Sequence, residues 1–250
     1  MSKSPKIIIA GGGIGGIAAT LSLLRRGYDV SVYEQAPELG EVGAGVQISP
    51  NGSRALDALG VFETLKAASC APRRKEFRLW NTGRAWPMFD LGEIAIEKYG
   101  YPYLTVYRPD LLQTLVDAVR AINPDAIKLG AKVSDAAVQD GGAVLHFEDG
   151  TSVEGDILIG ADGVKSVTRD ALFRTDPPRF TGQVAWRGVV ATDSVEAEAR
   201  ALPPGIWIGE RRLFMRYPMR GWSLLNYVAF VEMEGWEEEG WAIPSSNEEL

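Results

Sequence analysis

The feature that most constrains the fold is a glycine-rich segment near the N-terminus, between two apolar runs. The first apolar run, Ile7 to Ala10, leads into Gly11-Gly12-Gly13-Ile14-Gly15-Gly16, and a stretch with helical periodicity follows to Arg26. Gly27 then interrupts the pattern, and the second apolar run ends on Glu34. This order predicts a strand, a tight turn, a helix and a second strand, which is how a parallel α/β sheet begins.

The glycine spacing predicts a dinucleotide site. Gly11 permits a tight turn, Gly13 lets the backbone approach a pyrophosphate, and Gly16 lets helix and strand pack closely. The pyrophosphate would lie on the free N–H groups at the helix N-terminus, where the dipole also favours negative charge. Glu34, 18 residues after Gly16, can accept hydrogen bonds from ribose hydroxyls and would repel a 2′-phosphate. We therefore expect FAD or NAD rather than NADP, the alternative being a glycine-rich surface turn.

Composition excludes several other classes. The 250 residues suffice for one large domain or two modest ones, and the net charge of -7 disfavours nucleic acid or an anionic membrane as partner. Cys70 is the only cysteine, which excludes an intrachain disulfide and fits a reducing compartment such as the cytoplasm. His146 is the only histidine, so we predict no metal site and a solvent-facing strand position for this residue. No apolar run reaches the ~18 residues of a membrane helix, and the N-terminus leaves no room for a signal peptide.

Further elements follow from periodicity and turn signals. We expect a hairpin from Arg74 to Met88 and two helices, one capped by Asn51 and continuing to Phe62, and one over Arg108–Val119. Strands are predicted at 127–133, 137–138, 143–147, 151–153, 156–159, 183–191, 206–208, 212–217 and 222–232. The aromatic-rich strands beyond Pro178 predict a second, antiparallel sheet, whereas the segment between Glu34 and Asn51 has few marks of regular structure and is expected to be a functional loop.

Asp162 is a second candidate for ligand contact. A buried strand ends in Gly160-Ala161-Asp162-Gly163, and open α/β sheets bind ligands beyond the carboxyl ends of their strands. The carboxylate is therefore expected to bond a ribose or ribitol hydroxyl. The alternative is an Asp-Gly turn that caps the following helix.

These motifs together resemble the single-component FAD-dependent aromatic hydroxylases, also called group A flavoprotein monooxygenases. The likeness is greatest to salicylate hydroxylase and 3-hydroxybenzoate 6-hydroxylase, and it rests on the glycine segment, Glu34, the Gly43–Asn51 loop, Arg108 and Gly160–Gly163. It implies an α/β fold: a Rossmann-like FAD-binding domain (1–73 and 100–178) with an inserted, mostly antiparallel substrate sheet (74–99 and 179–250). The family's Gly-Asp-Ala-Ala-His-like motif is absent, so we expect the chain to be the N-terminal part of a longer protein.

The resemblance also implies roles for individual residues. Glu34 would bind the adenosine ribose, Gln35 the adenosine and pyrophosphate region, Val133 the adenine through its backbone, and Arg108 the ribityl-pyrophosphate part. Gln47 would lie beside the flavin as a cofactor-binding and catalytic residue. The full set of cofactor-binding candidates is Gly11, Gly13, Ile14, Gly15, Gly16, Glu34, Gln35, Gln47, Arg108, Val133 and Asp162.

The implied activity is hydroxylation of an activated, salicylate- or hydroxybenzoate-like ring through a flavin C4a-hydroperoxide. The cofactor would be non-covalent FAD, with NADH or NADPH as transient co-substrate and O2 as oxidant, and a homodimer is left open. Tyr217, which shares a strand face with Leu213 and Met215, is the first candidate for a catalytic hydrogen bond near the ring oxygen. Related enzymes have a histidine where Leu213 stands, which predicts a different substrate pattern.

Four arginines are unranked candidates for carboxylate recognition: Arg84, Arg187, Arg212 and Arg216. Two rival functions stay open. One is a FAD-dependent reductase or oxidase on the same scaffold. The other is a non-catalytic dinucleotide-binding protein, favoured if the chain truly ends at Leu250.

Overall fold

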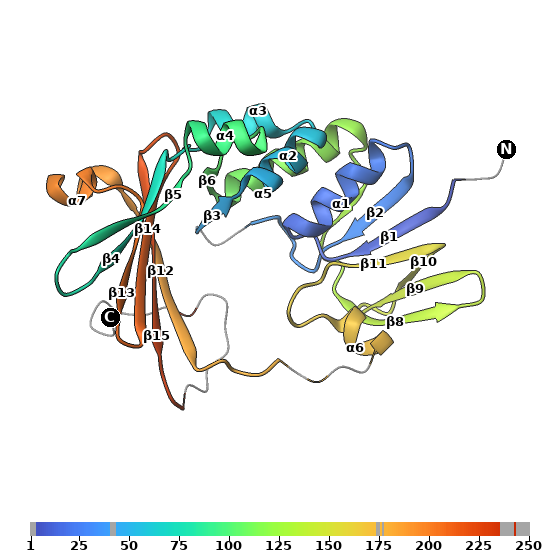
Figure 1. The fold of residues 1–250 in the computed structure, drawn as a ribbon. Helices are drawn as coiled ribbons and strands as arrows, with labels where there is room; N and C mark the ends of the chain where they lie inside the picture. Colours follow the sequence, from blue (N-terminus) through green and yellow to red (C-terminus); the bar gives the residue numbers. More distant parts are fainter. Residues whose placement is uncertain (1–3, 41–43, 174–175, 177, 236–242, 244–250) are drawn as a thin grey trace. The chain divides into compact units, whose positions relative to one another are not determined.

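The parallel sheet predicted around the glycine segment is present in the structure, a computed structural model that describes residues 4–40, 44–173, 176, 178–235 and 243 (Figure 1). The chain divides into two units. Unit 1 consists of residues 1–40 and 111–179, and unit 2 of residues 41–110 and 180–250. Each unit has its own sheets, which are described separately below.

The parallel sheet of unit 1 has the strand order β11-β1-β2-β7. Its strands are β1 (Lys6–Ala10), β2 (Asp29–Tyr33), β7 (Ile127–Lys128) and β11 (Ile157–Gly160), and every neighbouring pair is parallel. The helix α1 (Ile14–Leu24) packs against β1 and β2. Ile8, Ile9 and Ala10 are completely buried, as expected for a strand covered on both faces.

A three-stranded antiparallel sheet covers the other face of β1 (Figure 1). It consists of β8 (Val133–Gln139), β9 (Gly142–Phe147) and β10 (Ser152–Gly155). Ile8 and Ala10 pack with Leu145 and Phe147 in one core cluster. The predicted single strand over 127–133 is wrong, because Gly130, with φ +68°, separates β7 from β8. His146, predicted to face solvent, is half-buried opposite Ser152.

Two helices complete the part of unit 1 that the structure describes. The helix α5 (Arg108–Ile122) begins at the last residues of unit 2 and buries one apolar stripe, formed by Leu111, Leu112, Leu115, Val116 and Val119. The short helix α6 (Val167–Phe173) follows β11.

Unit 2 contains a six-stranded sheet with the order β12-β15-β14-β13-β4-β5. The strands are β4 (Arg74–Leu79), β5 (Ala85–Asp90), β12 (Gln183–Ala191), β13 (Gly205–Gly209), β14 (Arg212–Met219) and β15 (Leu224–Glu232). The β13–β4 pair is parallel and the other pairs are antiparallel, so the predicted, mostly antiparallel sheet is confirmed. The last strand starts at Leu224 instead of Trp222, because Arg220, Gly221 and Trp222 have positive φ angles and form the turn after β14.

A two-stranded ribbon and several short helices accompany this sheet. The ribbon pairs β3 (Gly45–Ile48), which lies in the segment expected to be an irregular loop, with β6 (Leu104–Tyr107). The hydroxyl of Thr105 on β6 donates to the carbonyl of Pro218 on β14 at 2.6 Å. The helices are α2 (Pro50–Ala58), α3 (Phe62–Ala67), α4 (Glu93–Tyr99), the 3-10 turn η1 (Thr192–Ser194) and α7 (Ala197–Ala201).

The predicted helix from Asn51 to Phe62 is wrong at its start and in its length. Ser49 occupies the N-cap position and Pro50 the first helical position, where a missing N–H costs nothing. Gly60, with φ +67°, then ends the first helix and separates α2 from α3. The helix α4 was not predicted from the sequence.

The boundaries of the two units differ from the predicted domains. Residues 41–73 and 100–110, expected in the FAD-binding domain, fall in unit 2. The two units are defined by how residues pack and not by which residues bind a cofactor. The division into a FAD-binding domain and a substrate sheet therefore stays a prediction. Within the described residues no helix is long and apolar enough to span a membrane. Gly43 of the predicted flavin loop, and most of the acidic segment after Glu234, lie outside the described residues.

Candidate functional site

The N-terminus of α1 carries backbone donors that no side chain of the described residues satisfies. Gly13 is the N-cap residue, without a side-chain hydrogen bond, and the first turn has no acidic residue. The first amide bonded back into the helix is that of Ile17, which donates to the carbonyl of Gly13 at 3.0 Å. The N–H groups of Ile14, Gly15 and Gly16 precede it and have no intrahelical acceptor.

The glycines of this turn fall into two groups. A Cβ at Gly11 would lie 2.4 Å from the carbonyl oxygen of Ala161, and a Cβ at Gly16 would lie 1.9 Å from that of Gly11. Packing therefore requires glycine at both positions. Gly11 also has φ +99°, a backbone angle that favours glycine. A Cβ at Gly13 or Gly15, in contrast, would have no atom within 4 Å. The backbone beside the helix N-terminus is thus open to a ligand.

Glu34 lies at the end of β2 with its carboxylate turned back to the glycine turn. Its Oε2 accepts from the N–H of Gly12 at 2.6 Å, and its Oε1 accepts from the N–H of Ala36 at 2.9 Å. Each carboxylate oxygen retains a further lone pair that could accept from a ribose hydroxyl. The carbonyl of Glu34 accepts from Ala131, two residues before Val133, whereas Gln35 is exposed. Of the predicted adenosine-binding residues, Glu34 therefore contacts the glycine turn directly.

Asp162 also lies beside the glycine turn, since a Cβ at Gly11 would approach its Cα to 2.8 Å. Its Oδ1 accepts from the hydroxyl of Ser166 at 2.5 Å, and its Oδ2 accepts from the N–H of Thr168 at 2.9 Å. The carboxylate therefore caps the start of α6, which is the alternative weighed from the sequence. Its contact with a cofactor stays a prediction.

These residues of unit 1 fit the adenosine and pyrophosphate part of FAD. The free amides and the dipole of α1 suit the pyrophosphate, the open positions at Gly13 and Gly15 allow close approach, and Glu34 suits the ribose. The helix N-terminus, the open glycine positions and Glu34 all belong to unit 1.

A polar cluster lies on one face of the six-stranded sheet in unit 2, centred on Gln47 of β3. Its Oε1 accepts from the Nζ of Lys75 at 2.7 Å and from the hydroxyl of Tyr103. Its Nε2 donates to the Sδ of Met215 on β14 at 3.2 Å. One amide side chain thus joins three strands of this unit and a fourth segment just before β6.

Tyr217 is the buried phenol of this cluster. It is 4% exposed, and burial raises its pKa to about 12, an effect that a hydrogen bond with Gln47 partly offsets. Burial also raises the pKa of Tyr103, and the nearby Tyr217 raises it further. Both phenols therefore remain protonated at any ordinary pH and can act as hydrogen-bond donors.

Asn226 on β15 holds Tyr217 against β3. It pairs opposite Tyr217, is fully buried, and accepts the N–H of Gly45 on Oδ1 at 2.7 Å. This bond identifies which end of the amide is oxygen and leaves Nδ2 as the donor end. Nδ2 is buried and has no hydrogen-bond partner among the described residues. An unsatisfied buried donor of this kind is costly, and in a native structure it requires an explanation.

Of the four candidate arginines, only one lies on the same face as Tyr217. Arg187 pairs opposite Val228, which in turn pairs opposite Met215, and directly paired residues share a face. Arg216 lies on the other face, where it stacks over Trp207 and donates to the carbonyl of Leu202.

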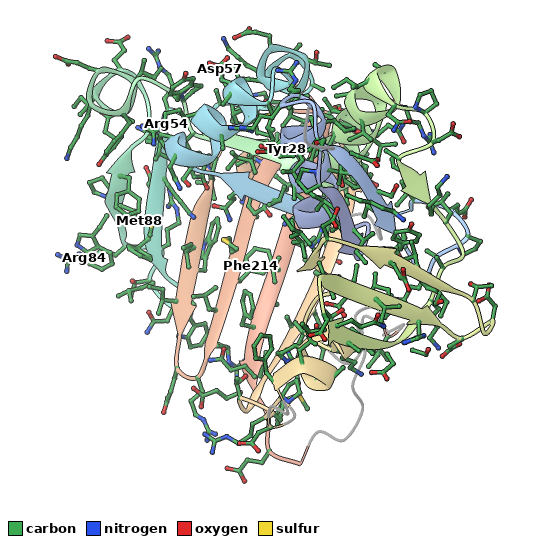
Figure 2. All side chains as sticks on the ribbon, turned by 90° about the vertical axis from the view of Figure 1, so that its right-hand side faces the viewer. Tyr28, Arg54, Asp57, Arg84, Met88 and Phe214 are labelled. Carbon is green, nitrogen blue, oxygen red and sulfur yellow. The ribbon has the colours of Figure 1, made fainter. Side chains whose placement is uncertain are left out.

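Arg84 and Arg212 are exposed. Arg84 lies on the β4–β5 hairpin together with Met88, whereas Phe214 lies within the sheet on β14 (Figure 2). Arg108, the first residue of α5, belongs to unit 2, and its N–H donates to the carbonyl of Ala44 at 2.9 Å. Its predicted contact with FAD stays a prediction.

Sequence reasoning missed Lys75, Tyr103 and Asn226. Lys75 could have been predicted, because it lies two residues before Phe77 on the predicted hairpin and therefore on the same strand face. Tyr103 and Asn226 carry no local signal, since their roles come from pairing between distant strands.

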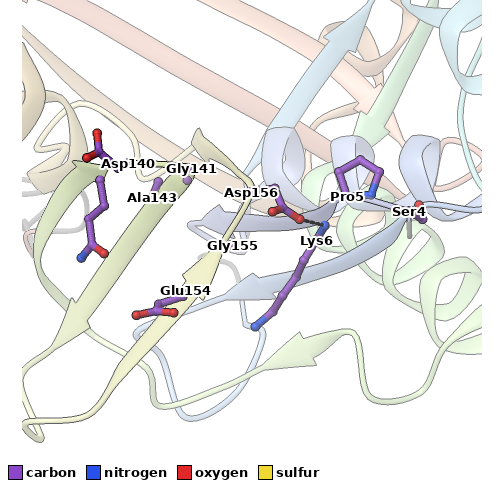
Figure 3. A pocket seen from close by; sticks show the side chains of 11 residues that line it. Ser4, Pro5, Lys6, Asp140, Gly141, Ala143, Glu154, Gly155 and Asp156 are labelled. Carbon is purple, nitrogen blue, oxygen red and sulfur yellow. Dashed lines mark hydrogen bonds between the residues drawn. The ribbon is translucent and has the colours of Figure 1, made fainter. Parts of the chain in front are cut away.

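A hollow of about 630 Å³ lies elsewhere in unit 1 (Figure 3). It surrounds Lys6, whose N–H donates to Oδ2 of Asp156 at 2.6 Å, and includes Asp140 and Glu154. Lys6 begins β1, whereas the glycine turn follows the other end of that strand. This hollow is therefore separate from the predicted nucleotide-binding residues. Among the described residues no group of His, Cys, Asp and Glu could hold a metal ion.

Comparison with known proteins places these features in context. A family model described as "FAD binding domain" matches residues 5–250. A 6-hydroxynicotinate 3-monooxygenase from Pseudomonas fluorescens is 37% identical, covering 100% of this chain and 65% of the relative. A 3-amino-4-hydroxybenzoate 2-monooxygenase from Streptomyces platensis is 34% identical (98% and 61%), and a 3-hydroxybenzoate 6-hydroxylase from Polaromonas naphthalenivorans is 34% identical (100% and 62%).

Two solved structures have the same fold as this chain. Klebsiella pneumoniae HpxO, solved with FAD and uric acid, superposes with a TM-score of 0.79 at 27% identity, covering 94% of this chain and 58% of that one. A salicylate hydroxylase substrate complex superposes with a TM-score of 0.77 at 24% identity, covering 98% and 60%, and shows the shared fold. The chain spans about three fifths of the length of the relatives named here.

Proposed function

Because this chain belongs to the FAD-binding domain family, we propose that it is the FAD-binding and substrate-binding part of an NAD(P)H-dependent aromatic hydroxylase. The observation that carries the proposal is the set of groups at the N-terminus of α1. Free amides, two glycines facing open space and the carboxylate of Glu34 suit a dinucleotide pyrophosphate and its ribose. Aromatic hydroxylation of this kind depends on such a cofactor.

The proposed substrate is an aromatic ring that carries both a hydroxyl and a carboxylate. The three curated relatives are named for a hydroxynicotinate, an aminohydroxybenzoate and a hydroxybenzoate, which share these two groups. The polar cluster of unit 2 supports this class, because it combines two protonated phenols, an amide and an ammonium group on one sheet face.

Bound FAD, reduced by NAD(P)H, would supply the activation of O2. The chain's own residues would bind and orient the ring and keep water away. Tyr217, protonated below pH 12, would hold a hydrogen bond to the ring oxygen and so position the carbon to be hydroxylated. Gln47 would fix the orientation of that phenol through their shared hydrogen bond.

Three finer points are also proposals. The family resemblance predicts NADH or NADPH as a visiting co-substrate rather than a resident one, because the dinucleotide site would already hold FAD. The single buried cysteine, Cys70, supports a cytoplasmic location. The third point is assembly as a homodimer, which size-exclusion chromatography with light scattering tests.

The test is a panel of hydroxybenzoates, hydroxynicotinates and their non-hydroxylated analogues, offered to purified protein with FAD. We expect flavin absorbance in the purified protein, NADH or NADPH consumption stimulated by the hydroxylated acids, and a hydroxylated product. Protein that never retains flavin would contradict the proposal at the cofactor step. Retained flavin with reduction unaffected by any aromatic acid would instead favour a reductase or oxidase.

A further inference from the structure

Lys75 carries the ammonium group of the polar cluster in unit 2. It lies on β4, and its Nζ donates to Oε1 of Gln47 at 2.7 Å, a neutral acceptor. No carboxylate pairs with Lys75 among the described residues. The carboxylate next to it in sequence, Glu76, lies on the opposite face of the sheet and pairs with Arg78 at 2.5 Å.

A half-buried ammonium with neutral neighbours is an unfavourable arrangement unless an anion joins it. Desolvation lowers the pKa of Lys75, which shows that its surroundings disfavour the charge. The other groups near it are also donors: the hydroxyls of Tyr103 and Tyr217, both kept protonated by burial. Among the residues that the structure describes, the cluster is therefore rich in hydrogen-bond donors and lacks negative charge.

Asn226 provides an independent indication. Its Nδ2 is buried without a hydrogen-bond partner in the described part of the chain, while Oδ1 of the same amide accepts from the N–H of Gly45. Tyr217 lies between this amide and Gln47, since it pairs opposite Asn226 and shares a hydrogen bond with Gln47. An unused donor and an uncompensated ammonium thus belong to one connected group of side chains. A carboxylate would compensate the ammonium charge of Lys75, and each of its oxygens could accept two hydrogen bonds from the donors of this group.

We propose that Lys75 is a specificity-determining residue that recognises the ring carboxylate of the substrate. This assignment rests on the proposed function and narrows it, because it selects aromatic acids over neutral phenols of the same shape. A charge-assisted hydrogen bond of an ammonium to a carboxylate is stronger than a neutral one, so the lysine sets affinity for the acid. Tyr217 then remains available to form the hydrogen bond with the ring hydroxyl.

The experiment compares two ligands that differ in one group, 3-hydroxybenzoate and 3-hydroxybenzamide, by calorimetric titration of FAD-loaded protein without NAD(P)H. We expect the wild-type protein to prefer the acid. Lys75→Met should weaken binding of the acid by about tenfold or more and leave binding of the amide nearly unchanged. Lys75→Arg should restore part of the preference, and the exposed Lys98→Met, matched in charge and size, should bind as the wild type does.

Each other outcome overturns a defined statement. Equal loss of acid and amide binding in Lys75→Met would place the lysine at the ring hydroxyl and overturn the carboxylate assignment. An unchanged preference in that variant would overturn it as well, while leaving the proposed function intact. Wild-type protein that binds FAD but neither ligand would overturn both. If thermal melting shows that Lys75→Met is unfolded, Lys75→Gln, which keeps a donor to Gln47 without the charge, answers the same question.

Discussion

The ring of Tyr217 lies against the backbone of Gly45, so closely that a Cβ at Gly45 would be 2.5 Å from Cε2 of that ring. The N–H of Gly45 donates to Asn226, which pairs opposite Tyr217 across β14 and β15. Glycine at this position therefore determines where the buried phenol stands. Gly45 lies in the segment between Glu34 and Asn51, which the sequence predicts to be an irregular functional loop.

Gly45→Ala should displace Tyr217 and destabilise the protein by about 1–3 kcal/mol, because the added methyl group overpacks a filled site. Urea unfolding measures this cost. In the double variant with Tyr217→Ala, much of the cost should disappear, since the ring that the methyl group meets is gone. Additive effects of the two substitutions would show that Gly45 acts on something other than Tyr217.

Gly13→Ala should reduce flavin affinity without reducing stability. No atom lies within 4 Å of a Cβ at this position, and its extended backbone suits alanine, but the methyl group would occupy the approach to the helix N-terminus. We expect at least about a tenfold loss of FAD affinity, or about 1.4 kcal/mol. Equilibrium dialysis measures the affinity and thermal melting the stability.

Two controls accompany this variant. Gly16→Ala should fail to fold, because its Cβ would lie 1.9 Å from the carbonyl oxygen of Gly11, whereas Gly40→Ala should behave as the wild type. Wild-type flavin affinity in Gly13→Ala would refute the proposed position of the pyrophosphate.

Glu34→Ala should both weaken FAD retention and destabilise the glycine turn. The carboxylate accepts from the N–H groups of Gly12 and Ala36, and an unsatisfied buried donor costs about 1–3 kcal/mol. Glu34→Gln retains one acceptor oxygen and should lose less stability. Flavin content after dialysis reports the ribose contact, and an unchanged content in Glu34→Ala would count against it.

Asp162→Asn separates the two roles considered for this residue. An amide oxygen can still cap α6 by accepting from Thr168 or Ser166, so stability should fall by less than the ~1 kcal/mol of a lost cap. If the carboxylate also binds the cofactor, FAD affinity should fall in this variant. We expect that fall; a variant with altered melting and normal flavin affinity would leave Asp162 as a capping residue alone.

Tyr217 should titrate far above an ordinary tyrosine. Its pKa is raised from 10.0 to about 12 in the folded protein, so folding favours the protonated phenol. This contribution to stability is complete below pH 10 and is lost as pH rises from 10 to about 12. Tyrosinate absorbance against pH should show a late-titrating group that Tyr217→Phe removes. The same variant should yield less hydroxylated product per NAD(P)H consumed, with flavin binding unchanged.

The glycine turn and its two strands could be predicted because their signals are local. Apolar runs of strand length, glycines at fixed offsets and an acid after the second strand lie within 29 consecutive residues. The same holds for the face of β14 that carries Tyr217, since strand side chains alternate with a period of two. The functional class followed from several such local motifs occurring in one order.

Helix starts and the roles of single polar groups were predicted less well. Asn51 and Ser49 are both good capping residues, and the proline between them favours Ser49. Asp162 could accept from a cofactor or from its own helix, and its sequence neighbours allow both. In each case the local sequence allows two arrangements, and the conformation of the surrounding backbone determines which one forms.

The sequence by itself determined the nucleotide-binding turn of unit 1, the mostly antiparallel sheet of unit 2 and the position of Tyr217 within it. Tertiary structure decided the cluster that gives this sheet its chemistry. Gln47 meets Lys75 and Tyr103 across 28 and 56 residues of chain, and Gly45 meets Asn226 across 181. Hydrogen bonds over such separations depend on which strands pair and in which register, and strand pairing is a property of the folded chain as a whole.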